Sequence, residues 1–231
     1  MTTKTTFLGL LLGASALGYG QTILYDKMSN AYSGNIIQSA WWSPDGSDYD
    51  VYTWDDFTLS ADSTISEVWW RGGNAITGNG GISGFSIRFY ESITGGFQPK
   101  ITALPENETP ADYLKGYDVS GTANETAIPG TILSEYHYAL PTSLTLKANT
   151  KYWIKIVANM GTFPFWGPTQ GTGAGSDGQC FRYFTGGPYF QYGSGDIAFQ
   201  LRGTSTVPEP TGVVTLLIGG AFALRRRFKR A

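Results

Sequence analysis

Ser83-Gly84-Phe85-Ser86-Ile87-Arg88-Phe89-Tyr90 alternates large apolar and polar side chains over eight residues. Successive side chains of a β-strand point to opposite faces of its sheet, so Phe85, Ile87 and Phe89 share one face. Ser86, Arg88 and Tyr90 share the other. The stretch therefore predicts a strand with one face in a core and the other face polar.

Two further segments follow the same alternation. In Tyr152–Ala158, Tyr152, Ile154 and Ile156 face one way, and Trp153 and Lys155 face the other. In Thr64–Arg71, Val68 and Trp70 alternate with Glu67, Trp69 and Arg71. We expect the first set of each segment in the core, and Trp69 on a face that water reaches.

Strand signals recur along the chain between Gly, Pro, Asn and Asp residues. The remaining predicted strands are Thr22–Tyr25, Asn35–Gln38, Tyr49–Leu59, Tyr113–Ser120, Ile132–Leu140, Cys180–Phe184 and Ile197–Arg202. No window shows helical periodicity. The pattern predicts an all-β fold, a two-sheet sandwich of jelly-roll type.

The N-terminus has the three parts of a secretory signal. Lys4 provides the positive start, Phe7–Leu17 is apolar, and Gly18-Tyr19-Gly20 offers the small residues that signal peptidase reads. We expect a signal helix at residues 1–20 and cleavage before Gln21, with cleavage after Ala16 as the alternative.

The C-terminus carries a second, more specific signal. Val207-Pro208-Glu209-Pro210 precedes the uncharged segment Thr211–Leu224, and five basic residues follow: Arg225, Arg226, Arg227, Lys229 and Arg230. As a helix, the uncharged segment would be about 21 Å long, short of the roughly 30 Å hydrocarbon core. Its favourable insertion free energy is only about −2 to −4 kcal/mol, which suits a brief stay in a membrane. By the positive-inside rule the basic residues form a cytoplasmic anchor.

This C-terminal arrangement resembles the PEP-CTERM sorting signal. The resemblance implies recognition by an exosortase in the inner membrane, cleavage near the motif, and release to the cell surface or an exopolysaccharide matrix. The chain is thus predicted to comprise a signal peptide (1–20), a β-sandwich domain (21–206) and a sorting signal with a short membrane helix (207–231).

The middle of the chain resembles a group of exported β-sandwich proteins that often precede such a tail. The residues concerned are Trp54–Leu59, Val68–Trp70, Ile87–Tyr90, Lys151–Ile154 and Gly195–Leu201. The resemblance implies a fold and no reaction.

The net charge of −2 conceals an acidic domain. Without Lys4 and the five C-terminal cations ten of the 16 basic residues remain, and without Glu209 seventeen of the 18 acidic ones, so the domain carries −7. It has no basic stripe, which argues against nucleic acid as a partner. Cys180 is the single cysteine, so the chain forms no internal disulfide, and we interpret Cys180 as a small buried side chain.

Catalytic motifs are sparse, and we expect no enzyme. His137 is the single histidine and no Gly-x-Ser-x-Gly motif surrounds a serine, which argues against a Ser-His-Asp triad. The alternative function is a polysaccharide-active enzyme of the glycoside hydrolase kind, which needs two carboxylates about 5 to 10 Å apart across a cleft. The candidates near strands are Asp55, Asp56, Glu67, Glu91 and Asp196.

A cation site is a further hypothesis. Asp45, Asp48 and Asp50 place three carboxylates in one turn, and calcium prefers oxygen ligands from such loops. The alternative is a solvated acidic loop, since the twelve-residue calcium loop with a terminal Glu is absent.

Seven tryptophans are the last signal. Exposed indoles can stack on the apolar face of a sugar ring, and each Trp-Trp pair of a strand should expose one ring. We expect Trp69 and Trp42 to be exposed and to contact glycan. The sequence thus predicts an exported structural or adhesive protein that meets exosortase, signal peptidase and, transiently, the inner membrane, and then extracellular polysaccharide.

The basic cluster offers a direct test of the sorting prediction. We expect replacement of Arg225, Arg226 and Arg227 together to leave the protein misprocessed, because the helix would lose its cytoplasmic anchor. Fractionation of the producing cells, with mass measurement of the released product, checks this. Release of an unchanged, shortened product would contradict the exosortase interpretation.

Overall fold

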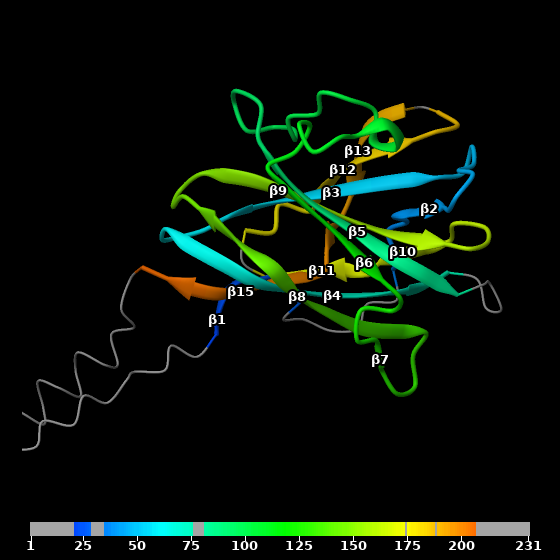
Figure 1. Ribbon diagram of the computed structural model, residues 1–231, viewed down its shortest axis with the longest axis horizontal. Coiled ribbons are helices and arrows are strands. Elements are labelled where there is room, and N and C mark those ends of the chain that lie inside the picture. The colour runs from blue at the N-terminus through cyan, green and yellow to red at the C-terminus, as the bar shows by residue number, and fades with distance from the viewer. Residues whose placement is uncertain (1–20, 29–34, 76–80, 174, 188, 207–231) are drawn as a thin grey trace, which may run out of the picture.

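The chain folds into stacked β-sheets (Figure 1). The structure, a computed structural model, describes residues 21–28, 35–75, 81–173, 175–187 and 189–206. Within these ranges the single helical segment is a 3-10 turn, η1 (Pro105–Asn107). The all-β prediction is therefore confirmed for the described part of the chain.

Two large sheets and one small one make up the fold. The six-stranded sheet contains β1 (Thr22–Asp26), β15 (Phe199–Ser205), β4 (Ser63–Asn74), β8 (Leu133–Leu146) and β7 (Thr126–Ala127) in this order, and β10 (Trp166–Pro168) pairs with β4. The seven-stranded sheet contains β13 (Tyr189–Ser194), β12 (Gln179–Phe184), β3 (Val51–Thr58), β2 (Ala40–Trp42), β9 (Lys151–Met160), β5 (Ile82–Glu91) and β6 (Lys115–Ser120). The small sheet pairs β11 (Gln170–Gly171) with β14 (Asp196–Ile197).

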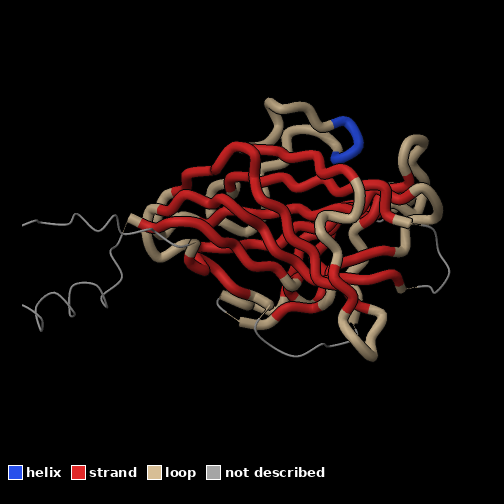
Figure 2. Tube along the Cα trace, turned by 60° about the horizontal axis from the view of Figure 1, so that its bottom comes forward, coloured by secondary structure: helices blue, strands red, loops and turns tan. Residues whose placement is uncertain are grey.

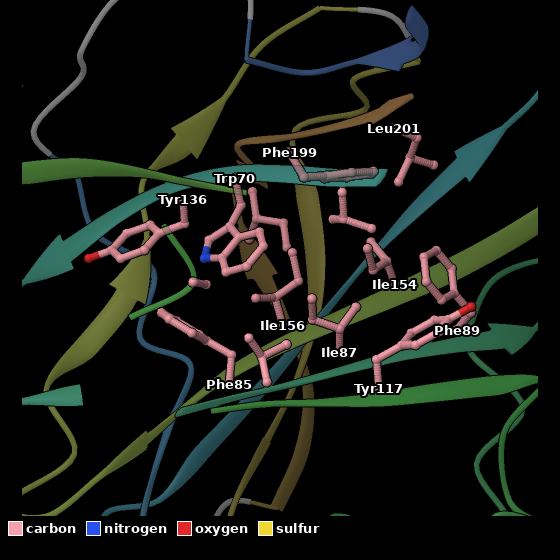
Figure 3. Close-up of a cluster of buried hydrophobic side chains, with 14 of the residues drawn as sticks. Trp70, Phe85, Ile87, Phe89, Tyr117, Tyr136, Ile154, Ile156, Phe199 and Leu201 are labelled. Carbon is pink, nitrogen blue, oxygen red and sulfur yellow. The ribbon is translucent and has the colours of Figure 1, made fainter. Parts of the chain in front are cut away.

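The core lies between the two large sheets (Figure 3). Phe85, Ile87 and Phe89 are fully buried on the inner face of β5, as the alternation predicts. From the opposite sheet, Trp70 stacks on Tyr136 at 5.6 Å and meets the Phe85 ring edge-on at 5.0 Å. The inner residues predicted for β9 and β4 are buried in the same cluster.

The predicted strands differ from the observed ones in several places. Asn35–Gln38 forms only an isolated bridge, Ile36 with Thr169, instead of a strand. The strand predicted at Ile132–Leu140 continues to Leu146, because its ladder with β4 resumes after an irregularity opposite Ile65 and Glu67. No strand is predicted at Tyr189–Ser194, where β13 forms the edge of the seven-stranded sheet, or at the short strands β2, β7, β10 and β11.

The seven-stranded sheet is covered on its outer face as well. The connection between β5 and β6, residues 92–114, crosses this face and carries η1, the blue turn above the strands in Figure 2. Trp153 and Lys155, on the face opposite the core, are buried although they point away from the six-stranded sheet. The outer side chains predicted for this strand therefore face a second packed layer instead of water.

The two predicted terminal segments, 1–20 and 207–231, lie outside the described residues. Among the residues that are described, no helix is long and apolar enough to cross a lipid bilayer. The described strands run from Thr22 to Ser205, within the predicted domain 21–206.

Trp70 provides a test of the packing. We expect Trp70→Ala to lower the free energy of unfolding by about 3–5 kcal/mol, since it removes a large ring between Tyr136 and Phe85. Trp42→Ala is the matched control, because its ring is exposed, and it should change stability by no more than about 1 kcal/mol. Urea unfolding followed by far-UV circular dichroism measures both. Equal losses in the two variants would place Trp70 outside the core.

Candidate functional site

Aromatic side chains line the outer face of the seven-stranded sheet from strand to strand. Tyr90 on β5, Trp153 on β9, Trp54 on β3 and Phe181 on β12 are all buried there beneath residues 92–114. Trp54 packs against Tyr90 and Phe181 with ring centroids 6.1 and 6.2 Å away. The layer is thus continuous across the sheet.

The aromatic layer continues onto the edge strand β13, which residues 92–114 leave uncovered. On the edge strand β13, Phe190 lies opposite Tyr183 and Tyr192 lies opposite Phe181. Tyr192 is 48% exposed and Phe97, in the adjoining loop, is 70% exposed; Tyr189 and Phe190 are exposed too. We call Phe97, Tyr189, Phe190 and Tyr192 the aromatic edge.

Contacts to the sheet hold the rings of β13: Tyr189, for example, lies with its centroid 6.4 Å from that of Tyr183. Phe190 stacks on the buried Phe181 at 5.7 Å and 14°, and its centroid lies 4.7 Å from that of Tyr183. Tyr192 meets Phe181 edge-on at 5.4 Å and donates a hydrogen bond of 2.8 Å to the carbonyl oxygen of Phe97. The β13 rings are therefore fixed against the sheet, and the hydrogen bond joins β13 to the loop.

Two hollows adjoin Tyr192. The larger, of about 340 Å³, lies between β13 and the loop, and its lining comprises Ile93, Gln98, Pro99, Ile101, Phe181, Phe190, Gln191 and Tyr192. The smaller, of about 190 Å³, is lined by Asp56, Gly96, Phe97, Lys151, Trp153, Asp177, Gln179, Cys180 and Tyr192. Planar apolar surface with a few amide and charged groups beside it is the composition of a small-molecule or saccharide site.

Buried polar contacts fasten the loop that forms one wall of the larger hollow. Glu108 pairs with the ammonium of Lys155 and accepts a hydrogen bond of 2.7 Å from the Tyr90 hydroxyl. Glu106 accepts a bond of 3.2 Å from the Tyr183 hydroxyl. These contacts fix the loop against the aromatic layer, so the wall is preformed.

Lys155 lies inside an aromatic enclosure. Its Nζ is 5.4 Å from the Tyr52 ring centroid, 5.1 Å from that of Trp54 and 5.5 Å from that of Tyr90. Burial lowers the pKa of Lys155 to about 8, although Glu108 acts in the opposite direction. The rings and Glu108 together stabilise a cation that burial alone would disfavour.

The tryptophans predicted to contact glycan lie elsewhere. Trp42 is exposed at 36%, beside Phe163, whose ring centroid is 6.2 Å away. Trp69 is not the open ring that alternation predicts: the Arg202 guanidinium lies 3.9 Å from its centroid and His137 stacks on it at 4.4 Å. Neighbouring side chains on the outer face of the six-stranded sheet leave Trp69 only partly exposed, which sequence periodicity cannot reveal.

The three aspartates of the calcium hypothesis do not share one role. Asp50 is buried, and its carboxylate accepts hydrogen bonds from the amides of Trp42 and Ser47 and from the Ser47 hydroxyl. Asp45 and Asp48 are exposed. No group of three or more His, Cys, Asp or Glu side chains suited to a metal occurs in the described part of the chain. Calcium binding stays a prediction that this loop geometry does not support.

Two of the carboxylates considered for glycoside hydrolysis do meet. Asp55 and Asp196 both contact the ammonium of Lys27, at 2.9 and 2.7 Å, but all three side chains are buried. Among the other candidates, Glu91 pairs with Lys100, Asp56 with Lys151, and Glu67 lies 3.3 Å from Nδ1 of His137. The buried pair has no access to a polysaccharide chain.

Cys180 is buried on β12, as predicted, and burial raises the pKa of its thiol to about 12. Its thiol therefore stays protonated and unreactive at neutral pH. The sorting motif Val207-Pro208-Glu209-Pro210 and the basic cluster lie outside the described residues.

The aromatic edge is the site that sequence reasoning missed. The signal is nevertheless present: two aromatic, alternating runs, Gln179–Phe184 and Tyr189–Tyr192, flank Thr185-Gly186-Gly187-Pro188, and Gly187 has a φ of 83° in the turn. The candidate site thus rests on its own geometry. No protein-family model, no curated protein and no solved structure matches the chain.

Proposed function

We propose that this protein is exported, sorted through a PEP-CTERM signal to the cell surface or extracellular matrix, and binds extracellular polysaccharide through the aromatic edge. The role is structural or adhesive and not catalytic. The binding proposal rests on the exposure of Phe190 and Tyr192, which lie on the edge strand β13. The aromatic side chains Phe181 and Trp54, on the next two strands of the sheet, are buried.

The chemistry of the edge favours a saccharide. The apolar face of a pyranose ring matches the plane of an aromatic side chain, and hydroxyl groups at the ring edge need polar partners. Gln98, Gln179 and Gln191 supply such partners beside the rings. Phe181 and Tyr183 already hold the Phe190 ring in place, so Phe190 loses little conformational entropy when a ligand binds.

Charge narrows the class of polysaccharide. The domain carries −7, and the smaller hollow contains Asp56 and Asp177 together with Lys151. An excess of negative charge disfavours anionic polymers, so the ligand proposed is a neutral glycan.

We also propose a jelly roll as the finer description of the fold. In support, β1, β15, β4 and β8 are neighbours in one sheet, and β3, β9, β5 and β6 follow one another in the other. Of the steps that link these eight strands along the chain, every one passes from one sheet to the other except the step from β5 to β6. The β12–β13 hairpin is then an addition that extends the seven-stranded sheet and carries the aromatic edge.

A glycan array of neutral oligosaccharides tests the binding proposal on the purified protein. We expect Phe190→Ala and Tyr192→Ala each to weaken binding about tenfold, equivalent to about 1.4 kcal/mol, since each removes one stacking surface. Gln191→Ala should weaken binding less, because it removes one polar contact and leaves the rings.

Tyr49→Ala and Trp69→Ala are the matched controls. Tyr49 is an exposed ring outside the edge, and Trp69 is the ring that sequence alone favoured. Both should bind as the unaltered protein does. Binding that is lost in Trp69→Ala but kept in Phe190→Ala and Tyr192→Ala would move the site to the other sheet, and no binding by any form would remove the glycan proposal.

A further inference from the structure

A lysine and two aspartates form a closed cluster at the end of the core. Lys27 follows β1 directly, Asp55 belongs to β3 and Asp196 to β14. Nζ of Lys27 lies 2.7 Å from Oδ1 of Asp196, 2.9 Å from Oδ1 of Asp55 and 3.2 Å from the main-chain oxygen of Asp56. The Lys27 and Asp55 side chains are completely buried, and that of Asp196 is buried too.

The surroundings of the cluster exclude water. Nζ of Lys27 lies 5.9 Å from the ring centroids of both Tyr25 and Phe199, which stack on each other. Asp56 also faces the amine, with Oδ1 at 3.7 Å, but its other oxygen pairs with Lys151. One ammonium therefore faces two carboxylates that have no other cation within the cluster, and burial makes such a charge imbalance costly.

Backbone amides hold both carboxylates in place. Asp55 accepts hydrogen bonds from the amides of Asp56, at 2.7 Å, and Ile197, at 2.8 Å. Asp196 accepts bonds from the amides of Gly178, at 2.8 Å, and Asp177, at 3.3 Å. An amine, a carboxyl group and a second carboxyl group are thus fixed within bonding reach, the arrangement that converts a bimolecular condensation into an intramolecular one.

We propose that Lys27 and Asp55 join in an intramolecular isopeptide bond, with Asp196 as the group that transfers protons. The bond links the residue that directly follows β1 of the six-stranded sheet to β3 of the seven-stranded sheet. In place of the buried ammonium it leaves a neutral amide, and Asp196 ends the reaction as a neutral carboxylic acid, so none of the three groups stays charged.

The reaction needs the acid form of Asp55 and the uncharged amine of Lys27. Burial, with a contribution from Asp196, raises the pKa of Asp55 to about 7, so its acid form is available near neutral pH. Burial disfavours the charge on Lys27, but Asp55 and Asp196 favour it, and the pKa of Lys27 is raised overall. The amine must therefore pass a proton to Asp196, which accepts it across 2.7 Å.

The reaction balances without a co-reactant. After that proton transfer, the Nζ lone pair attacks Cγ of the Asp55 acid and the N–C bond forms. The C–O bond of the Asp55 hydroxyl breaks, and the hydroxyl leaves as water with the proton returned by Asp196. Asp196 then takes the surplus proton from the new amide nitrogen, and no atom changes its oxidation state.

A hollow lies next to the closed cluster. Asp56 and Asp177, whose backbones contact the cluster, both line the smaller hollow beside Tyr192. We expect the released water to leave into that hollow. The bond would close a chain segment between residues that are 28 positions apart. Such closure constrains the unfolded chain as a disulfide does, in a protein whose one cysteine forms none.

Intact-mass measurement of the folded, purified protein tests the proposal. We expect the mass to be lower than the sequence of the same termini requires by one water molecule, and peptide mapping to recover Lys27 and Asp55 on one cross-linked peptide pair. Lys27→Arg keeps the charge but cannot form the bond, so it should show the full mass. Asp55→Asn should lose ammonia in place of water, because the amide nitrogen then leaves.

Two more variants separate the roles. Asp196→Asn should remain largely uncross-linked, because it removes the proton acceptor while it keeps the shape of the side chain. Lys151→Arg alters the neighbouring Lys151–Asp56 pair and should keep the cross-link. Full mass and separate Lys27 and Asp55 peptides from the folded, unaltered protein would overturn the proposal, and so would a water loss that persists in Lys27→Arg. The unaltered protein decides the matter even if a variant fails to fold.

Discussion

The seven-stranded sheet buries large side chains on both of its faces, and the rest of the molecule follows from this constraint. Its inner face packs Phe85, Ile87 and Phe89 against the six-stranded sheet. Its outer face carries Tyr90, Trp54 and Trp153. Exposure of these large rings to water would be unfavourable, and residues 92–114 cross over them. A loop can cover only part of so wide a sheet. The part that stays uncovered is β13, whose rings, together with Phe97 of the loop, form the aromatic edge.

Buried charge serves two different purposes in the two layers. Lys155 has one carboxylate partner, Glu108, and three aromatic rings, so its pair is balanced and fixes the covering loop. Lys27 has Asp55 and Asp196, so its cluster holds more negative than positive charge. A condensation needs a second acid that takes the proton from the amine, and Asp196 provides it beside Lys27 and Asp55. Lys27 is therefore placed for a covalent bond, whereas Lys155 is placed for an ion pair.

The alternation of single strands was predictable, but the layer outside the sheet was not. Phe85, Ile87 and Phe89 alternate so regularly that their shared burial followed from the sequence. The alternation of side chains in Tyr152–Ala158 places Trp153 and Lys155 on the other face of the sheet. It does not indicate which residues cover that face. The expected exposure of the Trp69 ring is reduced for the same reason. Arg202 and His137, which contact the ring, come from strands distant in the sequence. Periodicity assigns a face, and only tertiary structure decides whether the face is open.

The contact of Lys27 with Asp55 and Asp196 is harder to predict from the sequence than the face of a strand. Lys27 and Asp196 are 169 positions apart in the chain. From the sequence, each of the two aspartates is a candidate acid of a glycoside hydrolase, because such an enzyme needs two carboxylates across a cleft. Burial reverses that chemistry: the same pair, closed to solvent and supplied with an amine, is suited to condensation and not to hydrolysis. Exclusion of water therefore decides what this cluster can do, and the stacked rings of Tyr25 and Phe199 beside the amine are the part of the fold that provides it.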